Sequence, residues 1–200
     1  MANPADLEAI YELESLTIAH VRNEIGELQL VPQCDRISGP GTSYIMAAFT
    51  HLNPAGSRFS DGTYGIFYAA YTLDTAIAET RYNREQFLRA TSEPPMELDM
   101  RLLFADLREQ FHDIRGSQHE RPDIYAADDY SASQALGKRL RGHNSWGIVY
   151  DSVRHPGGEC AAVFQPPALS NCRQERYLFY VWDGARIITT YRKSSLRRMP

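Results

Sequence analysis

The sequence predicts an α+β fold with a mixed β-sheet core and an N-terminal helical extension. Strand-like aromatic runs come early in the main part of the 200-residue chain, helical patterns dominate its middle, and strand-like runs cluster at its end. Because strands and helices do not alternate regularly, the order disfavours a doubly wound parallel sheet. The chain also lacks GxGxxG behind a strand and lacks GxxxxGK[ST], so neither a Rossmann nor a P-loop nucleotide site is expected.

The first part of the chain is predicted to be helical. Asparagine followed by proline is typical of a helix start, and the apolar stripe behind this pair predicts a helix over residues 4–16. A second short helical segment is expected over residues 17–26, and the turn-rich stretch VPQCDRISGPGTS follows it as a linker. We therefore expect an N-terminal helical extension with its linker, residues 1–43, and a main domain, residues 44–200.

Two kinds of pattern predict the elements of the main domain. Short apolar and aromatic runs are typical of strands, and apolar stripes behind acidic N-caps are typical of helices. The predicted strands are SYIMAAFTH, GIFYAAY, residues 97–104, SWGIVYDSV, ECAAVFQP and the two halves of RYLFYVWDGARIITTY. The predicted helices are residues 75–89 behind Asp74 and the stretch DDYSASQALGKRLRGHN, which begins at Asp128 or Asp129. Asp183-Gly184 predicts a two-residue hairpin turn between the last two strands.

Composition and charge exclude several classes of protein. A formal net charge of −4 gives no general attraction to nucleic acid or to anionic lipid. No apolar run approaches the roughly 20 residues that span a bilayer, and the acidic N-terminus lacks the pattern of a secretory signal. We therefore expect a cytoplasmic protein that binds neither a membrane nor, directly, nucleic acid. The 3 cysteines and 6 histidines show no ligand spacing, so no metal site is expected.

The stretch GSRFSDGTYGIFYAAYTLDTAIAET contains four candidate site residues. The planar guanidinium of Arg58 can bind phosphate oxygens in a fork. Tyr64 and Tyr68 lie four apart in a predicted strand and should point to one face, where their rings can stack and their hydroxyls can bind a sugar or phosphate. Glu79 can hydrogen-bond ribose and stabilise the positive charge of a breaking glycosidic bond. Each also has an ordinary structural alternative: a solvated arginine, sheet packing, or a solvated helical carboxylate.

A second group of candidates follows a predicted strand in the stretch YDSVRHPGGECAAVF. The Ser152 hydroxyl can bind phosphate or ribose or act as a nucleophile, although no GxSxG nucleophile elbow surrounds it. Arg154 and His155 can add donors for an anion, and His155 as a general base is a further alternative. One arginine, two tyrosines, one glutamate and one serine together describe a pocket for a phosphorylated ribose compound.

These residues resemble the motif of a known family, the RES-domain proteins, which are named after an arginine, a glutamate and a serine. GSRFSDGTYGIFYAAYTLDTAIAET is similar to the first block of the family, with Arg58 and Glu79 in the first two places. WGIVYDSVRHPGGECAAVF is similar to the last block, with Ser152 in the third place. The similarity extends from about residue 44 to residue 182. The resemblance implies a fold similar to the ADP-ribosyltransferase toxins, with NAD bound in a cleft of a mixed sheet.

The resemblance also implies an activity and partners. It implies a bacterial toxin that depletes NAD by cleaving the nicotinamide–ribose bond, as an NAD phosphorylase or an NAD glycohydrolase. NAD would be the substrate, inorganic phosphate a co-substrate of the phosphorylase, and no cofactor or metal would be needed. The implied partner is a cognate Xre-like antitoxin, and a homodimer or a larger toxin–antitoxin assembly stays open. The implied catalytic residues are Arg58, Glu79 and Ser152, and the implied substrate-binding residues are Tyr64, Tyr68 and Arg154.

Two other functions stay open at this point. Some members of the family transfer ADP-ribose to a protein, so a mono-ADP-ribosyltransferase is one alternative. A non-catalytic module that binds a nucleotide or a partner protein is the other. The choice among phosphate, water and a protein as acceptor depends on pocket geometry, which the sequence does not give.

Overall fold

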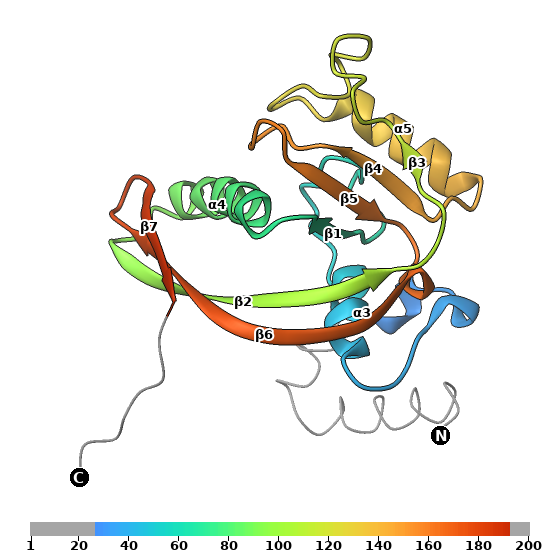
Figure 1. Ribbon diagram of the computed structural model, residues 1–200, viewed down its shortest axis with the longest axis horizontal. Coiled ribbons are helices and arrows are strands. Elements are labelled where there is room, and N and C mark those ends of the chain that lie inside the picture. Colours follow the sequence, from blue (N-terminus) through green and yellow to red (C-terminus); the bar gives the residue numbers. More distant parts are fainter. Residues whose placement is uncertain (1–26, 193–200) are drawn as a thin grey trace.

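A computed structural model of the protein describes residues 27–192 as two β-sheets with helices packed against them (Figure 1). The predicted α+β class with a mixed sheet is confirmed, because β3 pairs with β4 in parallel while the other strand pairs are antiparallel. The elements in chain order are η1 (Leu28–Leu30), η2 (Gln33–Asp35), α3 (Thr42–Thr50), β1 (Phe67–Ala70), α4 (Leu73–Ala90), β2 (Met96–Leu107), β3 (His112–Asp113), α5 (Ser131–Gly142), β4 (Gly147–Asp151), β5 (Glu159–Val163), η3 (Pro166–Ala168), β6 (Leu169–Trp182) and β7 (Ile187–Arg192).

The first sheet has four strands in the order β1-β5-β4-β3. Its central strands are apolar on both faces, and Ile148 of β4 and Ala162 of β5 are each 0% exposed. Such two-sided burial requires a cover on each face. Leu136 of α5 belongs to the same core cluster as Ile148 and Phe59, so α5 covers one face. Val163 packs with Phe49 of α3 in a second cluster on the other side.

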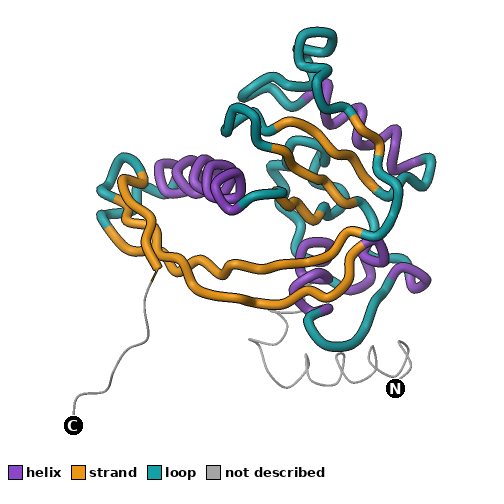
Figure 2. The backbone as a smooth tube through the Cα atoms, in the orientation of Figure 1, coloured by secondary structure: helices purple, strands orange, loops and turns teal. Residues whose placement is uncertain are grey.

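The second sheet has the order β2-β6-β7 and is dominated by two long strands (Figure 2). β2 and β6 bow beneath α4 and the first sheet in Figure 1. The pairing of β2 with β6 shifts register between Leu102 and Leu103 and again between Phe104 and Asp106. Because bulges bend a strand and increase its twist, these two irregularities account for the curvature. The curved sheet packs against α4 through a cluster that includes Leu88, Tyr180 and Trp182.

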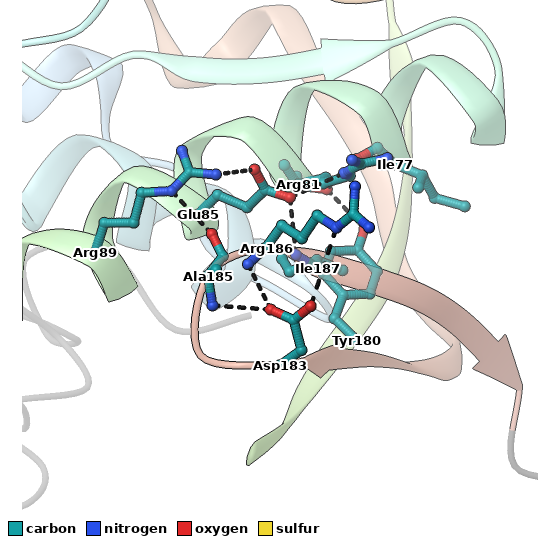
Figure 3. Close-up of polar contacts among 10 residues, drawn as sticks. Ile77, Arg81, Glu85, Arg89, Tyr180, Asp183, Ala185, Arg186 and Ile187 are labelled. Carbon is teal, nitrogen blue, oxygen red and sulfur yellow. Dashed lines mark hydrogen bonds and ion pairs between the residues drawn. The ribbon is translucent and has the colours of Figure 1, made fainter. Parts of the chain in front are cut away.

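A buried carboxylate fixes α4 against the β6–β7 hairpin (Figure 3). Glu85 Oε1 accepts hydrogen bonds from Ile187 N at 2.8 Å and from Arg81 Nε at 3.0 Å, and Oε2 accepts one from Arg89 Nη2 at 2.8 Å. Burial raises the pKa of Glu85, but the bonds from Ile187 and Arg81 outweigh it and the pKa lies below its usual value. Glu85 therefore ties the helix that carries the site residues to the second sheet.

Several predicted elements are confirmed. The strand in GIFYAAY is β1, the helix over residues 75–89 is α4, and the strand over 97–104 is part of β2. The predicted N-cap Asp74 is wrong, because α4 begins at Leu73 and Thr72 accepts from Thr75 N as its N-cap. The last two strands form the expected hairpin, but Trp182 pairs with Ile187, so its loop has four residues instead of two. Asp183 Oδ1 closes that loop by accepting from Ala185 N and Arg186 N, each at 2.8 Å. The predicted helices over residues 4–16 and 17–26 lie outside the described residues.

The strand expected in SYIMAAFTH is wrong, because this stretch forms helix α3. A nine-residue apolar run has no periodicity that separates a buried helix from a strand. Packing decides the outcome: Gly65 lies so close that a Cβ there would be 2.4 Å from Phe49 Cα. Val31, 3% exposed, joins the same core cluster as Phe49, so the segment just before α3 packs with the main domain. The predicted boundary at residue 44 stays a prediction.

Candidate functional site

Glu79 and Ser152 meet between α4 and the turn that follows β4. Ser152 is 4% exposed, and its Oγ donates to Glu79 Oε1 at 2.6 Å. The same Oγ accepts from Arg154 N at 3.1 Å and from His155 N at 2.9 Å. A serine hydroxyl has one proton to donate and two lone pairs to accept hydrogen bonds, so these three bonds satisfy the hydroxyl of Ser152 completely. Ser152 thus joins the turn to the catalytic candidate on α4.

Glu79 has one restrained oxygen and one open oxygen. Oε1 takes the bond from Ser152 and lies 4.0 Å from Cys160 Sγ. Within residues 27–192, Oε2 has no hydrogen-bond partner and is not sealed from solvent. Burial first, and the charge of Glu79 second, raise the pKa of the Cys160 thiol to about 12. Because Oε1 is bonded to Ser152 and Oε2 is not bonded within residues 27–192, Oε2 is the oxygen left to accept from a ligand hydroxyl or to face a developing positive charge.

Arg58 is held by the backbone of a distant loop. It is 8% exposed, and its Nη1 donates to Ile124 O and to Ala126 O, each at 3.1 Å. Its guanidinium carbon lies 4.8 Å above the centre of the Tyr130 ring. In the described part of the chain, Nε and Nη2 make no hydrogen bond and neither is sealed from solvent. Arg58 therefore keeps N–H groups for an anion.

Tyr64 and Tyr68 both hold the backbone of Phe59, the neighbour of Arg58. Tyr64 Oη donates to Phe59 O at 2.6 Å, and Phe59 N donates to Tyr68 Oη at 2.9 Å. The expectation that both lie on one strand is wrong, since β1 begins at Phe67 and Tyr64 precedes it. Burial raises the pKa of each phenol to about 12, so both stay protonated at neutral pH.

A cavity of about 180 Å³ lies beside these two tyrosines. Tyr64 and Tyr68 line it together with residues from the end of α3 and from the loop around Arg58, among them Ser57 and Ser60. The Tyr68 residue is 38% exposed although its hydroxyl is bonded to Ser57 Oγ at 2.9 Å. Tyr68 therefore keeps exposed surface beside the cavity, while its hydroxyl is bonded to the loop that carries Ser57.

Arg154 lies in a second polar cluster next to Glu79. Its guanidinium carbon is 3.4 Å from the centre of the Tyr82 ring. Its Nη2 donates to Ala127 O and lies 3.4 Å from both Asp128 Oδ1 and Tyr130 Oη. Tyr82 Oη donates to the same Asp128 oxygen. Arg154 is thus brought to the site, where it contacts Tyr82, Asp128 and Tyr130, none of which was predicted as a site residue.

Tyr82 and Tyr130 are not among the site residues predicted from the sequence. Tyr82 had a usable signal, because it lies three residues after Glu79 on the same helix and so on the same face. Tyr130 had none, since it precedes α5 and meets Arg58 only in the folded chain. Of the two aspartates predicted to begin the helix, only Asp129 contacts its start: Asp129 Oδ1 accepts from Ser131 N at 2.9 Å. Asp128 contacts Tyr82 and Arg154 instead.

The His155 ring contacts the first turn of α4. Its Nδ1 lies 2.8 Å from Thr75 Oγ1 in the first turn of α4. Gly158 closes the turn, and a Cβ at that position would lie 2.5 Å from the same Thr75 oxygen. The contact between His155 and Thr75 therefore fixes the turn against α4, beside the bond between Ser152 and Glu79.

Residues 27–192 contain neither a candidate metal site nor a helix that could span a membrane. No group of three or more histidine, cysteine, aspartate or glutamate side chains there could hold a metal ion. No helix in this range is both long and apolar enough to cross a membrane. The chemistry available is that of an anchored carboxylate with one open oxygen, two restrained arginines and several tyrosine rings. Such a set suits a ligand that carries a sugar and anionic groups.

Comparison with known proteins matches the chain to a family and to a bacterial relative. The RES domain family matches residues 33–183, which include Arg58, Glu79 and Ser152. An uncharacterized protein of Sinorhizobium fredii, y4oC, is 30% identical over 193 residues, which are 92% of this chain and 76% of that protein.

Proposed function

The chain belongs to the RES domain family, and we propose that it is an enzyme that cleaves the nicotinamide–ribose bond of NAD and acts as a toxin by depleting NAD. The observation that carries the proposal is the state of Glu79. One of its oxygens is fixed by Ser152, and the other is open. A carboxylate held in this way can stabilise positive charge without first reorganising.

The proposed step is dissociative. As the bond between ribose C1′ and the pyridinium nitrogen breaks, its electron pair goes to nicotinamide, which leaves neutral, and positive charge develops on the ribose. Glu79 Oε2 stabilises that charge or orients the ribose hydroxyls. An oxygen of phosphate or water then bonds to C1′, giving a phosphorylated ADP-ribose or, with loss of a proton, ADP-ribose.

The proposed substrate contacts use the remaining site residues. Arg58 offers its Nε and Nη2 donors to the phosphates of NAD or to inorganic phosphate. The exposed surface of Tyr68 and the cavity beside it offer a place for a flat heteroaromatic ring. NAD is then a substrate, and nicotinamide leaves without metal assistance because it is already a good leaving group.

The test is product analysis of NAD incubated with the purified chain, with and without inorganic phosphate. Release of nicotinamide with and without phosphate would indicate hydrolysis. Release only with phosphate would indicate phosphorolysis. Glu79→Gln should lower the turnover number roughly 100-fold or more, whereas Glu109→Gln, at an exposed position of the same charge, should not. Absence of nicotinamide release under all conditions rejects the proposal, and label from NAD entering a protein would identify a transferase.

The proposal includes a cognate Xre-like antitoxin and action on cytoplasmic NAD. Family membership supports this part. Expression of the chain alone should lower cellular NAD and stop growth, and co-expression of a protein encoded beside it should restore both. Growth arrest by the Glu79→Gln variant with unchanged NAD would contradict NAD depletion as the cause.

A further inference from the structure

Tyr82 and Arg154 converge on one carboxylate at the edge of the site. The Tyr82 hydroxyl donates to Asp128 Oδ1, and Arg154 Nη2 lies 3.4 Å from the same oxygen. The two charged partners differ in burial: the Arg154 side chain is 14% exposed, and the Asp128 side chain is 77% exposed. The site therefore has a restrained cation and an anion at the surface.

The donors are held independently of the carboxylate. Arg154 is stacked on the Tyr82 ring, and its Nη2 also donates to Ala127 O. Burial, followed by the bond to Asp128, raises the pKa of Tyr82, so its hydroxyl remains a donor at neutral pH. The bond from Tyr82 and the charge of Arg154 lower the pKa of Asp128, which keeps it ionised. Removing Asp128 would leave the tyrosine hydroxyl and the guanidinium in place with no anion between them.

The position of the Asp128 carboxylate relative to Glu79 fits a ligand that carries a ribose and a phosphate. Tyr82 lies three residues beyond Glu79 on α4, an axial rise of about 4.5 Å on the same helix face. Arg154 lies two residues beyond Ser152, which is bonded to Glu79. A ribose held at Glu79 carries its phosphate on C5′, and Tyr82, on the same helix face, and Arg154, in the same turn as Ser152, supply donors for that phosphate.

We propose that Tyr82 and Arg154 form the subsite for the pyrophosphate of a dinucleotide, and that Asp128 occupies this subsite until the substrate displaces it. The inference rests on the proposed function, because it places the reacting ribose at Glu79. Asp128 then acts as an internal competitor that lowers the affinity for phosphate-bearing ligands. A phosphate group makes two strong contacts here, and it replaces an exposed ion pair that contributes little.

The experiment uses ADP-ribose, which contains the pyrophosphate but not the bond to nicotinamide, so binding is measured without turnover. Calorimetric titration would compare the unmodified chain with Asp128→Asn, Tyr82→Phe and the matched control Asp129→Asn, which changes the same charge one residue away. We expect Asp128→Asn to bind ADP-ribose about two- to fivefold more tightly, the range of an exposed ion pair. Asp129→Asn should bind like the unmodified chain, and Tyr82→Phe should bind more weakly.

A second ligand separates the subsite from general effects of charge. Nicotinamide riboside lacks the pyrophosphate, so Asp128→Asn should not change its affinity. Unchanged or weaker binding of ADP-ribose by Asp128→Asn, an equal gain in Asp129→Asn, or no binding of ADP-ribose by any of these proteins would overturn the inference. Tighter ADP-ribose binding by Asp128→Asn in a protein that does not cleave NAD would reject the proposed activity alone.

Discussion

Ser152 Oγ donates to Glu79 Oε1 at 2.6 Å, although 73 positions separate the two residues. The hydroxyl proton of Ser152 is committed to the carboxylate, and both of its lone pairs accept from backbone N–H groups. His155, the alternative base, contacts Thr75 through Nδ1, and a Glu79 that took the serine proton would lose the negative charge that the proposed step requires. The geometry thus favours Ser152 as a positioning residue over Ser152 as a nucleophile.

Ser152→Ala should therefore lower the turnover number about 10- to 100-fold and change the KM for NAD less. A hydrogen bond to a charged group contributes about 1.5–3 kcal/mol, and each 1.4 kcal/mol or so is a factor of ten in rate. Steady-state kinetics of nicotinamide release would measure both constants, with Ser131→Ala, at an exposed position, as the control. Unchanged turnover in Ser152→Ala, or a covalent ADP-ribosyl adduct on Ser152 in the unmodified enzyme, would contradict the positioning role.

The two tyrosines should act on stability through one shared peptide. Tyr64→Phe removes the donor to Phe59 O, and Tyr68→Phe removes the acceptor of Phe59 N. Each change should lower the free energy of unfolding by about 1–2 kcal/mol. The double variant should lose less than the sum, because both bonds hold the same segment. Urea unfolding of the four proteins gives this coupling, and strict additivity would show that the two bonds act independently.

The cysteines should differ in reactivity. Cys34 is exposed, whereas Cys160 is buried and has a pKa raised to about 12, first by burial and then by the charge of Glu79. At pH 8 the thiolate of Cys160 is then about one part in ten thousand. Mass spectrometry after brief iodoacetamide treatment of the native protein should find the label on Cys34 and not on Cys160. In Glu79→Gln the pKa of Cys160 should be lower but Cys160 should stay unlabelled, because burial is the larger cause.

Much of the fold is predictable from local patterns. The apolar stripe of α4, the aromatic run of β1 and the location of the hairpin before β7 are each properties of a few consecutive residues. The exact N-cap of α4, which is Thr72 and not the predicted Asp74, and the four-residue length of the hairpin loop are not. Elements that depend on partners are not predictable in this way. α3 is a helix because of its packing against Gly65 and the first sheet, and the two-residue strand β3 exists only through its pairing with β4.

The candidate site also contains residues that the sequence indicates and residues that only the tertiary fold brings together. Arg58, Glu79 and Ser152 were selected because each residue type has the chemistry that a phosphorylated ribose requires, and the resemblance to a family joined them. The structure brings Glu79 and Ser152 into contact. The cluster of Tyr82, Asp128, Tyr130 and Arg154 comes from three separate segments, and its members have no common local pattern. Contacts of this kind follow from the tertiary fold, so no single stretch of sequence indicates them.

Glu85 should make stability depend on pH. Its pKa is lower in the folded protein than in the unfolded chain, so the unfolded state binds more protons as the pH falls. The stabilisation by Glu85 is therefore complete above its unfolded pKa of about 4.3 and is lost as the pH falls through the lower folded value. Glu85→Gln should cost about 1–3 kcal/mol at pH 7, since it weakens the contacts to Ile187 N and the two arginines. The difference between Glu85→Gln and the unmodified protein should shrink in acid, whereas Glu109→Gln should show no comparable change. A difference in unfolding free energy that stays constant across this pH range would show that the ionised form of Glu85 does not stabilise the contact between α4 and β7.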